Sequence, residues 1–82
     1  MADVTYYVAL PFSIGDDGPV PGAAIERTNA NAAIMRAESL SRKEGISGAI
    51  AFSRTGDPSV GDFADAVLLK AFGDVPNDLS AL

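Results

Sequence analysis

The chain of 82 residues contains no cysteine and no histidine. Without cysteine there is no disulfide framework and no thiolate nucleophile, and without histidine the commonest acid–base group at neutral pH is missing. The usual zinc sites and a Ser-His-Asp triad are excluded with them. The sequence therefore favours a protein that is not an enzyme, and we expect no catalytic residue, no metal and no cofactor.

Basic residues are also scarce, since six lysines and arginines stand against eleven acidic residues and the net charge is −5. Nucleic-acid affinity depends on clustered cations that neutralise phosphates, so this balance argues against nucleic acid and against anionic membrane surfaces as partners. The beginning of the chain holds no basic leader and no apolar run long enough to span a membrane. We therefore expect no membrane association and a cytoplasmic location.

The apolar content is sufficient for one small folded domain. Hydrophobic residues make up 48% of the chain and charged residues 21%, which is typical of a globular protein, although many of the hydrophobic residues are alanines. A domain of this size buries a modest core, about 60 to 65% of the surface of its unfolded chain. We predict a single domain over residues 1–82, in which residues 76–82 are loosely ordered.

A β-hairpin is predicted at the beginning of the chain. Residues 4–12 alternate between apolar and other side chains with a period of two, which is typical of a strand. The next residues are rich in Gly, Pro and Asp and predict a chain reversal at Asp16 to Gly18. A second strand near residues 23–28 would pair with the first, and Pro19 and Pro21 restrict its beginning to a sheet edge.

A helix is predicted after this hairpin. Apolar residues recur at spacings of three and four between Ala30 and Ser41, and Thr28, Asn29 or Asn31 can cap the first turn. Gly45 stands where a left-handed residue would close the helix. The alanine-rich face of this helix would allow it to lie close to a sheet.

Two further apolar runs complete the predicted fold. Residues 47–54 predict a third strand, and residues 63–73 match both a strand and a helix. A Gly-Asp-Pro loop between two apolar runs is typical of a hairpin, which favours a strand over residues 65–72. The order is then ββαββ, an α+β domain of two layers in which one helix covers an antiparallel sheet. If residues 62–72 are helical, the order is ββαβα.

The last predicted strand is apolar on both sides. Val67, Leu69 and Ala71 would point one way, while Leu68 and Phe72 would point the other way. Such a strand needs a cover on each face, and one helix supplies one cover. We therefore hypothesise that a second copy of the chain covers the other face, which would make the protein a homodimer.

The segment AFSRTGDPSVGDF, residues 51–63, gathers the polar side chains that could form a site. Ser53, Arg54, Thr55 and Asp57 are the candidates for ligand binding, because an arginine supported by hydroxyls and amides can hold a carboxylate or a phosphate. The alternative is a structural turn, in which glycine and proline set the backbone and Asp57 hydrogen-bonds to its own loop. We prefer the structural interpretation.

Two resemblances accompany these patterns. The run from GAIAFSRTGDP to FGDVP resembles the C-terminal half of a family of short alphaproteobacterial proteins, and the resemblance extends over residues 6–79. That family has no assigned activity, so it implies a small bacterial protein and transfers no functional residue. The strand YYVAL, an Asp-Gly turn, a second strand and a Thr-led helix are similar to HicB-type antitoxin domains, but AAIERTNAN replaces their Pro-Asp-x-Pro-Gly-like segment.

These observations together predict a non-enzymatic domain that binds a protein partner or associates with itself, at an apolar face or edge of its sheet. One alternative is a small-anion-binding protein or minor enzyme that uses the loop of residues 53–62. Another alternative is an antitoxin-like adaptor that binds a toxin.

Overall fold

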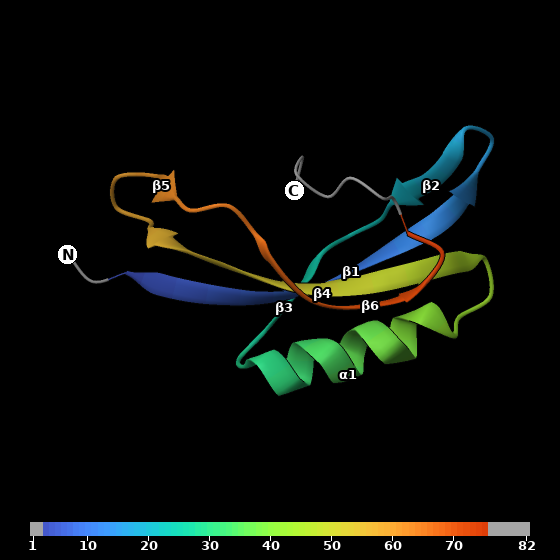
Figure 1. Cartoon of the computed structure of the whole chain (residues 1–82), viewed down its shortest axis with the longest axis horizontal. Coiled ribbons are helices and arrows are strands. Elements are labelled where there is room, and N and C mark those ends of the chain that lie inside the picture. The colour runs from blue at the N-terminus through green and yellow to red at the C-terminus, as the bar shows by residue number, and fades with distance from the viewer. Residues whose placement is uncertain (1–2, 76–82) are drawn as a thin grey trace.

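The computed structural model describes residues 3–75, which form one helix and an antiparallel sheet of six strands (Figure 1). The strands are β1 (Val4–Gly15), β2 (Gly18–Pro21), β3 (Ile25–Arg27), β4 (Ile46–Asp57), β5 (Asp62–Phe63) and β6 (Val67–Gly73), and the helix is α1 (Ala30–Ser41). The helix lies across one face of the sheet. The predicted class, an α+β domain with one helix on an antiparallel sheet, is confirmed.

The long strands β1 and β4 form the centre of the sheet. They pair with each other from Val4 opposite Gly56 to Ser13 opposite Ile46. On each side the next position is filled by two short strands: β2 and β3 both pair with β1, and β5 and β6 both pair with β4. The predicted order ββαββ therefore describes the arrangement coarsely, and the six strands arise because each outer strand is interrupted.

The predicted strand boundaries differ from the structure in the outer strands and at the ends of the two central strands. The strand expected near residues 23–28 corresponds to β3, and a separate strand β2 precedes it and contains both prolines at the sheet edge. The central strands are also longer than predicted, ending at Gly15 and Asp57. Both extensions have a pairing partner, since the end of β1 pairs with β2 and the end of β4 pairs with β5. The lengths of β1 and β4 thus depend on the strands that pair with their ends, which the sequence of β1 or β4 alone does not reveal.

The segment that matched both a strand and a helix is a strand. β6 pairs with β4 from Gly73 opposite Gly48 to Val67 opposite Ser53, with a register shift at Leu69. The prediction of a strand over residues 65–72 is confirmed within one or two residues, and the helical alternative for residues 62–72 is wrong. The backbone groups along this side of β4 need hydrogen-bond partners, and an extended β6 supplies them.

The helix begins at one of the capping residues that the sequence indicated, but it does not end at the predicted glycine. Of the three candidates for the cap, Asn29 is the one used, and its side-chain oxygen accepts a hydrogen bond from the Ala32 N–H at 2.8 Å. At the other end the cap is Arg42, whose N–H donates to the carbonyl oxygens of Ser39 and Leu40, and Gly45 lies beyond it with a left-handed φ of 84°.

Alanine side chains form the contact between the helix and the sheet. Ala9 of β1, Ala49 and Ala51 of β4, and Ala33 and Ala37 of α1 all have an exposed fraction of 0%. Larger residues surround this contact, namely Tyr7, Ile25, Ile34, Leu40, Leu69 and Phe72. Because a methyl group adds little depth, the two layers approach each other closely and leave no room for larger side chains at these five positions.

The opposite face of the sheet has its own apolar cluster. Leu10, Phe12, Ile50 and Phe52 are between 0% and 9% exposed. Ala66 before β6 and Val75 after it pack against this cluster. The four residues are thus buried within one chain, while the homodimer expected from the apolar sides of the last strand stays a prediction.

We predict that Ala37→Leu destabilises the fold by about 1 to 3 kcal/mol, because the added carbon atoms would have to fit between the helix and the sheet. The control is Ser39→Leu, which adds a leucine to an exposed position of the same helix and should change stability by less than about 0.5 kcal/mol. Urea unfolding followed by circular dichroism measures both. Equal stability of the two variants would show that the alanines do not limit the distance between the layers.

Candidate functional site

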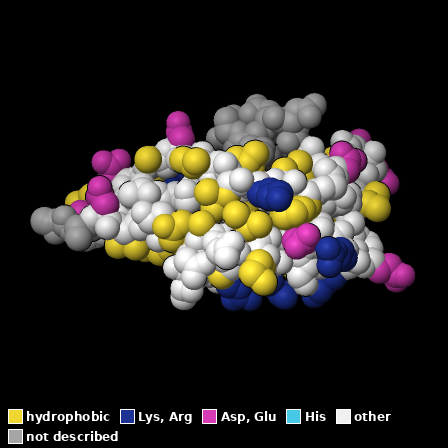
Figure 2. Space-filling model, turned by 60° about the horizontal axis from the view of Figure 1, so that its bottom comes forward, with side chains coloured by type: hydrophobic (Ala, Val, Ile, Leu, Met, Phe, Trp, Pro, Cys, Tyr) yellow, Lys and Arg dark blue, Asp and Glu magenta, His cyan; other side chains and the backbone are white. Residues whose placement is uncertain are grey.

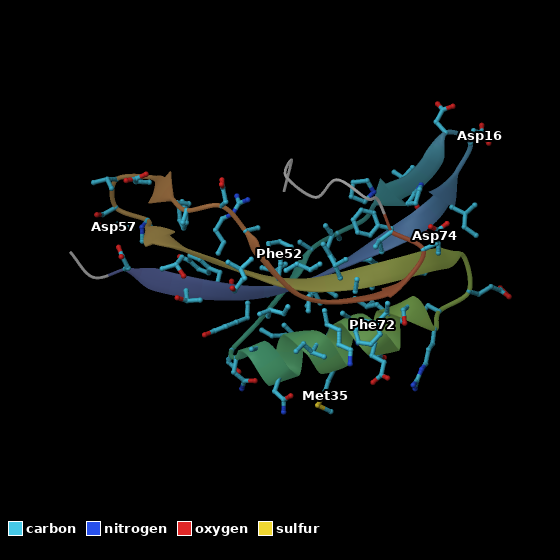
Figure 3. All side chains as sticks on the ribbon, viewed as in Figure 1. Asp16, Met35, Phe52, Asp57, Phe72 and Asp74 are labelled. Atoms are coloured by element: carbon cyan, nitrogen blue, oxygen red, sulfur yellow. The ribbon has the colours of Figure 1, made fainter. Side chains whose placement is uncertain are left out.

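The polar segment of residues 51–63 forms the end of β4, a short loop and β5. The loop is closed by the N–H groups of Val60 and Gly61, which both donate to the carbonyl oxygen of Asp57, at 3.3 and 3.0 Å. Gly61 has a φ of 70°, the left-handed conformation that returns the chain to the sheet. This end of the protein is therefore a β-hairpin, and it lies at the far end of the sheet from Asp16 (Figure 3).

The side chain of Asp57 holds this loop. Its Oδ1 atom accepts hydrogen bonds from the Ser59 hydroxyl at 2.7 Å and from the Ser59 N–H at 2.9 Å. The hydroxyl and then the backbone N–H stabilise the charged carboxylate, and together they lower the pKa of Asp57 below its ordinary value. A carboxylate with a lowered pKa is a poor general base at neutral pH, so this geometry fits the structural interpretation of the loop.

The three candidates that precede Asp57 lie on two different faces of β4. Side chains alternate along a strand, so Ser53 and Thr55 are on the side of the helix while Arg54 is on the opposite side. The hydroxyl groups of Thr55 and Thr5 lie 2.8 Å apart and share a hydrogen bond across the strands. The structure therefore does not bring the arginine and the two hydroxyls together around a common point.

Aromatic side chains lie on the Arg54 side of this hairpin. The rings of Tyr6 and Phe63 have their centroids 5.9 Å apart. Phe63 also lies over Gly56, because a Cβ atom added to that glycine would come within 2.7 Å of the Phe63 Cα. The hairpin is thus closed by packed side chains on this face.

A shallow hollow of about 560 Å³ lies beside the beginning of β1. It is lined by Thr5, Glu26, Arg27 and Thr28, all of them exposed, and none of the four residues singled out in the sequence contributes to it. Glu26 and Arg27 bring one negative and one positive charge to this hollow, so their charges offset each other. A ligand bound here would stay in contact with water, so the hollow has little basis for selecting one anion over another.

The described residues contain no concentrated acid–base or metal chemistry. Among residues 3–75 no polar or charged residue is buried, and no three acidic side chains lie close enough together to hold a metal ion. A helix able to cross a membrane is likewise not found in this range. The features that remain as candidates for function are therefore on the surface of the sheet.

The two edges of the sheet differ in how they are protected. The edge formed by β2 and β3 is short and interrupted, and it contains two prolines. The other edge is formed by β6, which runs for seven residues without proline and pairs with β4 alone among residues 3–75. Short strands and prolines are means by which proteins avoid pairing at an edge, and β6 has neither.

Apolar side chains project from β6 on both sides of the sheet. Val67 is 59% exposed and pairs with Ser53 on the helix side, whereas Leu68 is 48% exposed and pairs with Phe52 on the other side. Figure 2 shows hydrophobic side chains gathered on the face above the helix, while the acidic side chains lie mainly towards the two ends of the molecule. The apolar character of the edge thus extends to both of its faces.

The backbone of β6 also presents hydrogen-bonding groups to the outside. The Asp74 N–H donates to the Ser47 carbonyl oxygen at 2.9 Å, which shows that Asp74 directs its N–H towards β4. Because this direction alternates along an antiparallel strand, the N–H and C=O of Ala71 point away from β4. The sequence signal for this edge was the last apolar run, whose two sides are both apolar.

No family model, no curated protein and no solved structure matches this chain. The resemblances to short alphaproteobacterial proteins and to HicB-type domains therefore stay predictions.

We predict that Asp57→Asn weakens the dependence of stability on acidic pH. Because the pKa of Asp57 is lowered by folding, its ionised form adds stability above the ordinary pKa, and this contribution is lost as the pH falls through the folded value. Asparagine keeps the Oδ1 acceptor but does not titrate, so the variant should lose less stability than the wild type between about pH 5 and pH 2. Thermal unfolding across this range measures the difference.

The matched control is Asp16→Asn, which removes the same charge from the turn at the other end of the sheet. Superimposable pH profiles for Asp57→Asn and the wild type would contradict the role given to the Ser59 hydrogen bonds.

Proposed function

We propose that this protein is a non-enzymatic binding domain that pairs an extended segment of a protein partner with the outer edge of β6. The observation that carries this proposal is the difference between the two edges, since β6 is longer than β2 or β3 and free of proline, and its pairing with β4 continues on both sides of the register shift at Leu69. Addition of a strand to an exposed edge is a common way in which proteins recognise extended peptides. Main-chain hydrogen bonds supply affinity in such a complex, and side chains on both faces supply specificity.

The exposure of Val67 and Leu68 supports the proposal, because an added strand would place side chains beside both of them. They lie on opposite faces of the sheet, so a surface packed on one face would remove only one of them from water. Burial of apolar area at about 25 cal/mol per Å² favours an occupant that contacts both faces. A strand alongside β6 is the simplest such occupant.

Small-anion binding or catalysis at residues 53–62 has less support. The guanidinium of Arg54 and the hydroxyls of Ser53 and Thr55 lie on different faces of β4, and the Asp57 carboxylate is engaged by Ser59. An antitoxin-like adaptor is a special case of the present proposal, because the toxin would be the protein partner.

The test is capture of partners from cells of the natural host with a tagged protein and three lysine variants. Val67→Lys and Leu68→Lys place a charge on the β6 edge, and Met35→Lys places the same charge on the outer side of the helix, where Met35 is 65% exposed (Figure 3). We expect the wild type and Met35→Lys to capture the same partner and both edge variants to lose it, because lysine on an edge disfavours strand pairing. Circular dichroism establishes that all variants are folded.

Ala71→Pro examines the backbone pairing directly, since it removes an N–H that points away from β4. Capture that survives in all three edge variants would contradict the proposal. So would a wild-type protein that captures no partner and remains monomeric by analytical ultracentrifugation.

A further inference from the structure

We infer that the partner segment is extended and carries an anion opposite Lys70 with a cation towards each of its ends. This inference rests on the function proposed above and adds the chemistry of the partner. It follows from the order of charges on β6 and on the residues that flank it, and from the shape of the β6 backbone.

The charges along this edge are few and have a fixed order. Between residues 65 and 74 the charged residues are Asp65, Lys70 and Asp74, and all three are exposed. Lys70 lies within β6, whereas Asp65 belongs to the connection before the strand and Asp74 follows its last residue. The chain on β6 and on its two flanks thus carries a negative, a positive and a negative charge in that order, and a complementary strand carries the reverse order.

Lys70 is positioned to interact with a partner. Its Nζ atom lies 5.5 Å from the centre of the Phe72 ring, so the side chain is held along the strand on the helix side. Among residues 3–75 no carboxylate lies within ion-pair distance of this amine. Opposite charges directly across two strands stabilise their pairing, and like charges destabilise it. An acidic side chain opposite Lys70 is therefore favoured over an apolar or basic one.

A second copy of the chain fits this edge poorly. The register shift at Leu69 and the φ of 72° at Gly73 leave three regular residues, Lys70 to Phe72, between two irregular positions. Two-fold pairing of β6 with itself would have to align these irregularities, and the register centred on Lys70 would set two lysines opposite each other. A regular strand has no such difficulty, since β4 pairs with β6 on both sides of the shift at Leu69.

The overall charge of the protein favours the same partner. The chain has a net charge of −5, so a segment with two cations and one anion is attracted at long range before it pairs. An acidic segment with the reverse order would be repelled by the protein as a whole and by both ends of the edge. Long-range attraction and local pairing thus select the same order of charges.

The test uses two fluorescent ten-residue peptides of alternating threonine and valine. One has lysine at both ends and glutamate in the middle, and the other has glutamate at both ends and lysine in the middle. We expect the wild type to bind the first peptide several-fold more tightly by fluorescence anisotropy. The variant Lys70→Glu should reduce this preference about threefold or more, which is the effect of one cross-strand charge pair.

The control is Lys43→Glu, which changes the net charge by the same amount at an exposed position after α1. It should leave the preference largely intact. Equal effects of Lys70→Glu and Lys43→Glu, equal affinity of the wild type for both peptides, or binding of neither peptide at about 1 mM would each overturn the inference.

Two outcomes separate this inference from the proposed function. Equal binding of both peptides, with amide exchange slowed along β6, would overturn the charge order and leave strand addition at the edge intact. A wild-type dimer that Leu68→Lys dissociates and Met35→Lys does not would overturn the inferred partner in favour of a second copy. Peptides that slow exchange elsewhere and leave β6 unchanged would contradict both proposals.

Discussion

The alanine side chains between α1 and the central strands determine how closely the helix lies on the sheet. Five alanines with no exposed surface bring the helix close to β1 and β4, but each buries little apolar area. The larger residues around them, including Leu69 and Phe72 of β6, must therefore contribute much of the stability of this layer. For this reason β6 is attached through both its backbone pairing with β4 and its packing against the helix cluster, while its outer edge stays exposed.

The second apolar cluster explains why one helix is enough for a sheet with two apolar faces. Leu10, Phe12, Ile50 and Phe52 are buried without a second helix, and the residues that pack against them include Ala66 and Val75 on the connections before and after β6. The two ends of β6 are thus tied to one face of the sheet, while the middle of the strand packs against the helix cluster on the other face. A strand fixed in this way can receive another strand along its edge with little rearrangement of its own backbone, which lowers the entropic cost of binding.

Much of the fold was predictable because local patterns and packing agree. The alternation in β1, the asparagine cap of α1 and the hairpin chemistry before β6 each specify local structure. The division of the outer strands was not predictable, because strand ends depend on pairing with distant residues. The same limit affected the candidate site: a third strand that ends at residue 54, followed by a loop, allowed Ser53, Arg54 and Thr55 to converge. Pairing with β1 extends β4 to Asp57 and separates these residues onto two faces.

The bulge at Leu69 and the lysine beside it bear on specificity. Natural proteins use bulges and lysines on edge strands to prevent uncontrolled pairing, and both are present in the middle of β6. Whether they oppose strand addition depends on the incoming strand. A second β6 carries the same bulge and the same positive charge, so it is disfavoured twice, while a regular strand with an acidic residue at the matching position avoids both penalties. In the proposed complex, the features that disfavour a second copy would therefore also narrow the range of partner strands, so that a largely apolar edge could be selective.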